Sequence, residues 1–317
     1  MKLSGRLGII HYPVDYLLGR ISKSGWKFLS YKAGISENKN LSYLGIFAHY
    51  NQFKRVSEYV FYYLEKLLDA GIEIVFVSNS KLSKKDIERL LKTVRIVIVR
   101  KGRGRDFGSY FVGWQVAKRE LGIENFKGVL FCNDSVFGPI EYKDSKTFKE
   151  KMEILFQKPF GGITDSWEGA YHLQSYFITF NQEVIKSGLI DRFFRSYVFF
   201  NNKRRVIERY EIGLSQFMIK EGIKPFAICE YFDILTRKKA QQRVSKSHIY
   251  LNPTHFFWDI LIEDMQCPFL KIELIRDNPS KIQNISKFYN VISEKTQYPP
   301  ELITSHLMLR RKVKHIK

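Results

Sequence analysis

The first 140 residues alternate between short apolar runs and longer amphipathic stretches. The apolar runs are rich in β-branched and aromatic residues and cover residues 44–49, 72–77, 94–99 and 128–132. Runs of this kind are typical of strands buried on both faces of a sheet. The stretches between them repeat apolar residues at helical spacing over 56–70, 83–93 and 107–121. Because strands alternate with helices, the pattern predicts an α/β fold: a Rossmann-type, mostly parallel sheet with helices on both faces.

After Pro139 the pattern is less regular. It predicts helices over 147–157, 182–200 and 212–221, strands over 161–164, 175–180 and 225–229, and a basic polar connection over 236–247. We therefore divide the chain into four parts. They are an irregular N-terminal extension (1–40), a nucleotide-binding half (41–140), a second half of the same domain (141–280) and a basic C-terminal tail (281–317).

The chain is strongly basic, with 52 Lys and Arg against 32 Asp and Glu and a formal net charge of +20. Such a charge favours a nucleic acid, an anionic lipid surface or a polyphosphate ligand, although a lysine-rich proteome would also produce it. No apolar run approaches the ~18 residues of a membrane span, and we identify no signal peptide. The three cysteines lie far apart, as expected of buried thiols in a reducing compartment. The candidates for contact with an anionic membrane are Arg310, Arg311, Lys312, Lys314 and Lys317.

Two carboxylates follow predicted strands within residues 94–140. In open α/β sheets ligands bind at the carboxyl ends of the strands, where Asp106 and Asp134 would both lie. Asn133, Asp134 and Ser135 directly follow a buried run, and a carboxylate in that position can hold Mg²⁺ or Mn²⁺. An Asx turn is the alternative explanation.

Residues 102–108 (GRGRDFG) form a glycine loop ahead of a predicted helix. Glycines let the backbone approach a ligand closely, and amides at a helix start favour anions. Arg103 or Arg105 is placed to contact phosphate oxygens, and Asp106 to accept from a ribose or sugar hydroxyl or from a base. A basic turn with Asp106 as a helix cap is the alternative. The loop has no Walker A pattern and no GxGxxG after the first strand, which disfavours a dinucleotide fold.

The first two predicted strands also end in polar residues. His49 and Tyr50 follow the first strand, and Ser78 and Asn79 follow the second. Tyr50 is suited to stack on a nucleotide base, and Ser78 or Asn79 to read its edge. Taken one at a time, each of these residues is explained more simply as an ordinary loop residue.

The second half holds residues suited to a hydroxylated acceptor. Asp165, Trp167, His172 and Gln174 lie next to predicted strands, and an indole face often stacks on a sugar ring. A structural role for His172 is the alternative.

Three further residues are candidates for chemistry. Glu211 falls near a predicted helix start, where the helix dipole keeps a carboxylate ionised as a general base must be; first-turn glutamates are also common without function. His255 could add one nitrogen to a metal site, without support from a second spaced histidine. Lys271 can reach a diphosphate unless it faces solvent. The chain has no GxSxG elbow, so a nucleophilic hydrolase finds no support.

Six segments match a known family in the same order along the chain. They are AHY (48–50), IVFVSNS (74–80), GRDFGS (104–109), CNDSVFGP (132–139), HLQSYF (172–177) and YE (210–211). With them the chain resembles the rhamnan synthesis protein F family of bacterial polysaccharide glycosyltransferases. The resemblance implies a GT-A-like fold and a nucleotide-sugar donor. It aligns Asn133, Asp134 and Ser135 with the D-x-D motif of such enzymes. It aligns Glu211 with the residue that acts as general base in inverting enzymes.

The resemblance implies an inverting transferase that adds rhamnose from dTDP-L-rhamnose to a cell-surface polysaccharide or O-antigen intermediate. The basic charge favours a lipid-linked acceptor. We expect the transferase in the cytoplasm, peripheral to the inner face of the plasma membrane, with an anionic membrane surface and no nucleic acid as partner. The predicted donor and diphosphate residues are His49, Tyr50, Ser78, Asn79, Arg105, Asp106, Asn133, Asp134 and Lys271. Asp134 and His255 are the predicted ligands of Mg²⁺ or Mn²⁺. Because only one aspartate of D-x-D is kept, metal-independent catalysis stays open.

Two rival hypotheses come from other classes of protein. A basic nucleic-acid-binding protein would use the same charge with aromatic stacking, but it does not explain carboxylates at successive strand ends. A non-catalytic scaffold in a polysaccharide assembly complex would keep the fold with a decayed site.

Overall fold

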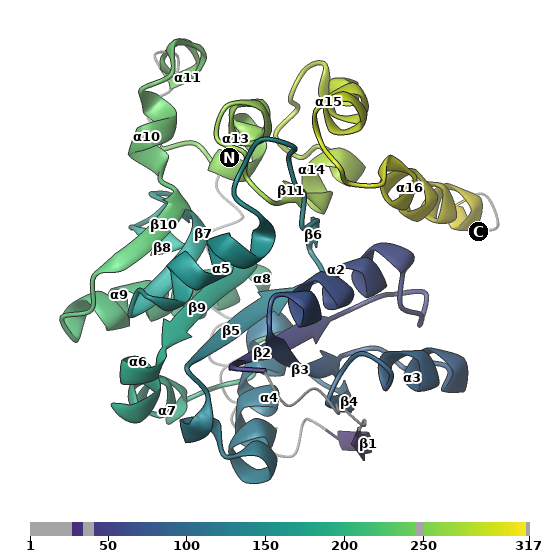
Figure 1. Cartoon of the computed structure of the whole chain (residues 1–317), viewed down its shortest axis with the longest axis vertical. Coiled ribbons are helices and arrows are strands. Elements are labelled where there is room, and N and C mark those ends of the chain that lie inside the picture. The colour runs from purple at the N-terminus through teal and green to yellow at the C-terminus, as the bar shows by residue number, and fades with distance from the viewer. Residues whose placement is uncertain (1–26, 34–40, 245–249, 315–317) are drawn as a thin grey trace, which may run out of the picture.

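The computed structural model describes residues 27–33, 41–244 and 250–314. Its centre is a twisted sheet in the order β1-β4-β3-β2-β5-β9-β7-β10, with β8 paired to β7 (Figure 1). The strands are β1 (Lys27–Ala33), β2 (Tyr43–His49), β3 (Ile72–Ser78), β4 (Ile96–Lys101), β5 (Gly128–Asn133), β7 (Phe160–Ser166), β8 (His172–Leu173), β9 (Phe177–Asn181) and β10 (Pro225–Cys229). The four strands β2 to β5 are parallel, whereas β1 and β9 run antiparallel to their neighbours.

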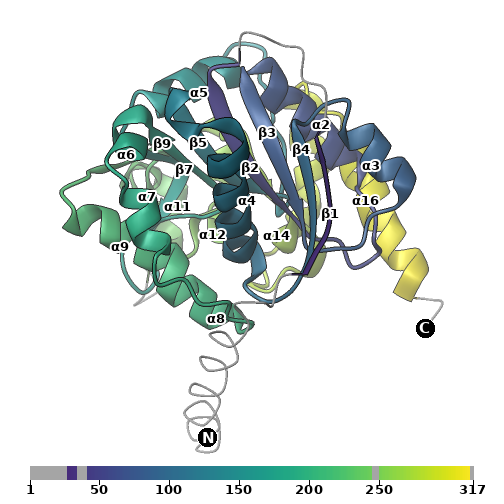
Figure 2. The ribbon, with the colours of Figure 1, turned by 90° about the horizontal axis from the view of Figure 1, so that it is seen from below.

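Helices cover both faces of this sheet, as predicted (Figure 2). On one face lie α2 (Glu58–Asp69), α3 (Lys84–Leu90) and α5 (Phe148–Phe156), and on the other α4 (Arg105–Leu121), α6 (Gln182–Lys186), α7 (Leu189–Phe194) and α9 (Gly213–Lys220). The apolar runs of the strands therefore serve two cores. In β2, Phe47 belongs to one core while Ile46 and Ala48 belong to the other, and all three are buried.

The central helix α4 lies very close to the sheet because of one glycine. A Cβ atom at Gly113 would overlap Ile46 of β2 and approach Val77 of β3 to 3.0 Å. A larger residue would push α4 away. This close approach fixes the start of α4, and with it Asp106, over the carboxyl ends of the parallel strands.

Three parts of the fold differ from the sequence-based prediction. Residues 27–33 are not irregular, because β1 adds an antiparallel edge strand to β4. The single helix predicted over 182–200 is two short helices, separated where Gly188 adopts a φ of +70°. The connection predicted over 236–247 contains the helix α11 (Lys238–Val244), which follows α10 (Tyr231–Leu235).

The C-terminal part of the chain is made of helices and one short strand. It contains α12 (Pro253–Phe256), α13 (Trp258–Glu263), β11 (Leu270–Lys271), α14 (Ile272–Asp277), α15 (Phe288–Lys295) and α16 (Pro300–Lys314). The His306 ring of α16 stands edge-on to Tyr59 of α2, with 4.8 Å between ring centroids. The strand β11 pairs with β6 (Val136–Phe137), the short strand after β5. Residues far along the chain are thereby brought to the strand ends.

Within the described residues, no helix combines the length and the apolar character needed to cross a membrane. Lys317, and the side chains of Arg310, Arg311, Lys312 and Lys314, lie outside the described residues.

Candidate active site

The ends of β2 and β5 and the start of α4 border one cleft of about 460 Å³. Asp106 and Asp134 both line it, although 28 positions separate them in the sequence. The other predicted residues in its wall are Tyr50, Arg105, Asn133, Glu211 and Lys271. The predicted meeting of strand-end side chains at one sheet edge thus gives one shared cavity.

The glycine loop before α4 is held in place by a buried arginine. Arg100 is 1% exposed, and its guanidinium donates to the carbonyl oxygens of Arg103 (2.9 Å) and Arg105 (2.8 Å) and to Ser109 Oγ (3.0 Å). At Gly104 the φ is +99°, and a Cβ atom there would lie 2.8 Å from Phe199 and Tyr197. Arg100 and Gly104 therefore determine where Asp106 begins the helix.

Asp106 lies in a network of buried polar groups. Asn133 Nδ2 donates to Asp106 Oδ2 (3.2 Å) and to the Tyr110 hydroxyl (3.1 Å). Burial raises the pKa of Asp106; the charge of Lys271 opposes this shift and that of Glu211 adds to it. The Asn133 amide therefore orients the Asp106 carboxylate, which is a role for Asn133 beyond ligand contact.

Asp134 is the second carboxylate of the cleft. The backbone N–H of Tyr50 donates to Asp134 Oδ2 (3.1 Å), which ties the end of β2 to the end of β5. Burial, and then the charge of Asp106, raise the pKa of Asp134 well above its usual value. Two carboxylates in such a place need positive charge from a ligand, a cation or a nearby side chain.

His49 lies directly behind Asp134. Burial lowers the pKa of His49 to about 3, so its imidazole is neutral at physiological pH. Its Nδ1 is 2.9 Å from Ser78 Oγ. Its Nε2 is buried without a hydrogen-bond partner among the described residues, 3.7 Å from Asp134 Oδ2 and too far for a hydrogen bond. An unpaired imidazole nitrogen beside a carboxylate is a donor pair that fits a divalent cation.

Lys271 supplies positive charge from the C-terminal part. The pairing of β11 with β6 sets Lys271 opposite Val136, and Lys271 Nζ donates to Ser135 Oγ (3.0 Å). Burial lowers the pKa of Lys271, while the carboxylates of Glu211 and Asp106 oppose that shift. The ammonium group thus lines the same cleft as these two carboxylates and interacts with their charge.

Glu211 is placed differently from the prediction. It is not at a helix start: α8 (Lys203–Val206), a π-helix (Ile207–Ile212) and α9 follow one another without interruption. The backbone N–H of Ser175 donates to Glu211 Oε1 at 2.8 Å, so this bond fixes the position of the carboxylate. π-Helical turns often occur at functional sites, and this one turns Glu211 toward the cleft.

Two predicted donor residues brace the strand ends instead of lining the cleft. Ser78 is fully buried and holds His49, as described above. Asn79 bonds the backbone of Gly102 twice, with its Nδ2 donating to the carbonyl (3.0 Å) and its Oδ1 accepting from the N–H (3.1 Å). Both residues link neighbouring loops.

Three of the four predicted acceptor residues are taken up by internal bonds. Asp165 Oδ1 accepts from the Tyr231 N–H (2.6 Å), and burial raises the pKa of Asp165 to about 6. His172 Nδ1 donates to the Ala170 carbonyl (2.8 Å), and Gln174 Oε1 accepts from Thr164 Oγ1 (2.7 Å). All three are buried. Trp167 alone of the four lines a cavity, and this cavity is a second one.

His255 does not join the carboxylate pair in the cleft. Its Nδ1 is 2.9 Å from Ser280 Oγ, and burial together with the positive charge of Lys271 lowers its pKa. Because His255 does not line the cleft, we do not assign it to the cation site. Among the described residues, no group of three or more His, Cys, Asp or Glu side chains could hold a metal.

The cleft also contains residues that sequence reasoning missed. They are Tyr59, Lys203, Glu273, Arg276 and His306. Lys203 pairs with Glu273 (2.9 Å), and this pair joins α8 to α14 at the rim. The basic run 203–205 was a visible signal for Lys203. No local pattern marks His306, because only the packing of α16 on α2 brings it there.

Comparison with known proteins gives a family. A model of the family described as rhamnan synthesis protein F matches residues 74–315. The virulence protein VirA of Vibrio anguillarum is 32% identical over 216 residues, covering 62% of this chain and 68% of that protein.

Among solved structures, a protein described as a nucleotide-diphospho-sugar transferase from Desulfovibrio desulfuricans is 10% identical with a TM-score of 0.34, covering 65% of this chain and 91% of that one. The glycosyltransferase GlyE of Streptococcus pneumoniae is 10% identical with a TM-score of 0.38, covering 84% and 64%. Structural similarity at this level supports no conclusion about the site. The match over residues 74–315 shows that the chain belongs to the rhamnan synthesis protein F family and is a glycosyltransferase.

Proposed function

We propose that this glycosyltransferase takes its sugar from a nucleotide diphosphate donor, whose diphosphate binds beside Asp134 and Lys271. The observation that supports this most is that Asp106, Asp134, Lys271 and Glu211 line one cleft although they are far apart in sequence. Lys271 and Arg105 supply positive charge where the leaving diphosphate gains negative charge. Tyr50 is 60% exposed at the rim and presents its ring to the base of the nucleotide.

Glu211 is the proposed general base. The Ser175 N–H holds Oε1, so the second carboxylate oxygen is left to take the proton of an acceptor hydroxyl. The acceptor oxygen then bonds to the anomeric carbon as the bond from that carbon to the diphosphate oxygen breaks. Attack from the face opposite the diphosphate inverts the anomeric centre. Glu211 and Asp134 lie on different elements that border the cleft. The base and the leaving diphosphate can therefore lie on opposite sides of the anomeric carbon.

A divalent cation fits the pair formed by Asp134 and His49 Nε2. When bound, it would neutralise charge on the leaving diphosphate. Among the described residues we assign it these two side chains, and Lys271 already brings positive charge to the same cleft. We therefore propose that Mg²⁺ or Mn²⁺ strengthens donor binding, and that a basal activity remains without it.

The proposed donor is dTDP-L-rhamnose, and the proposed acceptor is a lipid-linked polysaccharide or O-antigen intermediate at the inner face of the plasma membrane. Membership of a family named for rhamnan synthesis supports the sugar. The net charge of +20 supports a membrane surface and a lipid-linked diphosphate as partners. These finer assignments rest on the family and the charge rather than on contacts in the cleft.

A ligand panel tests the proposal. Thermal shifts would be measured with dTDP-, UDP- and GDP-sugars, with and without Mn²⁺, and release of the free nucleotide would be followed with a glycan acceptor. We expect stabilisation by dTDP-L-rhamnose and acceptor-dependent release of dTDP. Binding without any release would favour the scaffold hypothesis, and no stabilisation by any nucleotide sugar would refute the donor site.

A further inference from the structure

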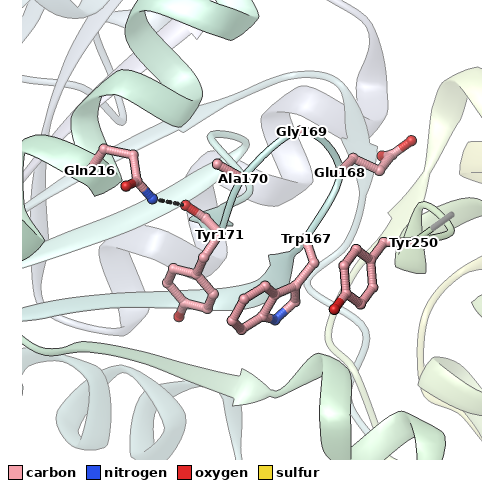
Figure 3. A pocket seen from close by; sticks show the side chains of 7 residues that line it. All are labelled: Trp167, Glu168, Gly169, Ala170, Tyr171, Gln216 and Tyr250. Atoms are coloured by element: carbon pink, nitrogen blue, oxygen red, sulfur yellow. Dashed lines mark hydrogen bonds between the residues drawn. The ribbon is translucent and has the colours of Figure 1, made fainter.

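A second cavity, of about 820 Å³, lies at the turn between β7 and β8 and is walled by aromatic rings (Figure 3). We call it the aromatic cleft. It is lined by Trp167, Glu168, Gly169, Ala170, Tyr171, Gln216 and Tyr250. The Trp167 ring stands between the other two, with centroids 5.2 Å from Tyr171 and 5.7 Å from Tyr250. Figure 3 shows the nitrogen-bearing edge of the indole facing Tyr250.

Aromatic rings in and beside the aromatic cleft keep exposed surface outside the hydrophobic core. Tyr250 is 47% exposed, and Phe232, whose ring lies 5.2 Å from that of Trp167, is 51% exposed. Trp167 Nε1 is buried without a hydrogen-bond partner among the described residues. Exposed aromatic surface beside an unsatisfied N–H is costly in a protein that binds nothing there. A ligand with an apolar face would cover the exposed rings of Tyr250 and Phe232.

The aromatic cleft adjoins the segment that carries the proposed base. Gly169 packs against Ile212, the residue after Glu211, and a Cβ atom at Gly169 would lie 3.2 Å from Ile212 Cδ1. Gln216, one turn further along this helical segment, donates from Nε2 to the Tyr171 carbonyl (2.7 Å). The charge of Glu211 also adds to the effect of burial in raising the pKa of Glu168. The two cavities are therefore neighbours around one helical segment.

The lining of the aromatic cleft selects the kind of ligand. Among the described residues that line it there is no Lys or Arg, and the one charged side chain is Glu168, whose carboxylate accepts from Asn252 Nδ2 (2.7 Å). These lining residues offer no positive charge to a diphosphate. A sugar ring presents an apolar C–H face that can lie on an indole or phenol ring, and hydroxyl edges that can bond Glu168, Gln216 and the tyrosine hydroxyls.

We propose that the aromatic cleft binds uncharged sugar rings of the acceptor glycan, beyond the ring that receives the new sugar. This inference rests on the proposed function and deepens it: the acceptor is an oligosaccharide, and the enzyme senses its length. A volume of about 820 Å³ lies within the range of roughly 300–1,000 Å³ typical of small-molecule sites. An acceptor of one ring would occupy only the cleft that contains Glu211, whereas a longer acceptor would occupy both cavities.

The test uses the full chain and synthetic rhamnose oligosaccharides of one to four rings. In the wild type we expect kcat/KM to rise about tenfold between one ring and the longer acceptors. Tyr250→Ala should reduce the long-to-short ratio toward one. Tyr289→Ala is the matched control, because Tyr289 is similarly exposed (42%) and lies outside both cavities. Trp167→Phe should lower the ratio less than Trp167→Ala, with thermal melting as a check on folding.

Direct binding separates this inference from the proposed function. Titration of a four-ring oligosaccharide without donor should quench tryptophan fluorescence in the wild type but not in Trp167→Phe, and Tyr250→Ala should weaken the affinity about tenfold. If the wild type binds the oligosaccharide but transfers no sugar, glycan binding by the aromatic cleft is supported and the proposed function is refuted. Equal kcat/KM on all lengths, or an unchanged ratio in Tyr250→Ala, overturns the inference. So does sedimentation showing that Tyr250→Ala abolishes self-association while glycan binding persists.

Discussion

The substitution Glu211→Gln tests the proposed base with little change of shape. Glutamine keeps the length of the side chain, and its carbonyl oxygen can still accept the 2.8 Å bond from the Ser175 N–H. It cannot take a proton from an acceptor hydroxyl. The fold, the π-helix and the walls of the cleft should therefore remain, while the chemical step loses its base.

The size of the effect follows from the role and the surroundings of Glu211. A positioned general base is worth ~10²–10⁴ in rate, so kcat should fall by that factor, which is about 3–5 kcal/mol on the barrier. Donor affinity should hold or increase slightly, because Lys271 loses one of the two carboxylates that face it. Neutralising Glu211 removes negative charge from a cleft that must bind a diphosphate.

The assay measures nucleotide release at saturating donor and acceptor, together with the donor dissociation constant by calorimetry. Glu208→Gln is the control: Glu208 lies in the same π-helix, is exposed, pairs with Arg204 (2.7 Å) and does not line the cleft. It should keep nearly full activity. If Glu211→Gln also turned over within a few-fold of the wild type, Glu211 would not be the base.

Three further substitutions test other residues of the proposed site and of the fold that supports it. Asp134→Ala should weaken donor binding roughly tenfold or more by calorimetry; an unchanged donor affinity would show that the diphosphate binds elsewhere. Arg100→Met should destabilise the fold in urea by about 3 kcal/mol or more, since three buried hydrogen bonds to a charged group are lost; a change under 1 kcal/mol would contradict its role as the support of the loop. The pKa of Asp165 is raised from 3.8 to about 6, so its contribution to stability is full below pH 4 and is lost as the pH rises toward 6. Asp165→Asn should therefore stabilise the protein at pH 7–8, by on the order of 2 kcal/mol, with no gain below pH 4; equal gains at both pH values would refute this reasoning.

The strands and helices of the first half were predictable because the local spacing of apolar residues shows which of their side chains are buried. The four parallel strands lie within two residues of their predicted starts and ends, and α3 begins after Ser83, the first residue of the helical stretch predicted over 83–93. Elements whose burial depends on distant partners were not predictable in this way. The strand β1 forms only by pairing with β4, and α16 has its place only through packing on α2.

The same distinction applies to the cleft. The strand-end rule brought Asp106 and Asp134 together, since it depends only on strand direction. It could not tell which polar side chains face a ligand and which bond to a neighbouring loop, as Asn79 and Gln174 do. Nor could local pattern show that Glu211 lies within a continuous helix, because the π-helical turn has no simple sequence signal.

The most direct measurement is the structure of the protein crystallised with dTDP-L-rhamnose or, if that donor fails to bind, with the nucleotide sugar that gives the largest thermal shift. Our account predicts the diphosphate within hydrogen-bond reach of Lys271 Nζ, next to Asp134, with the anomeric carbon facing Glu211. A diphosphate bound anywhere else, for instance against Trp167 in the aromatic cleft, would contradict it.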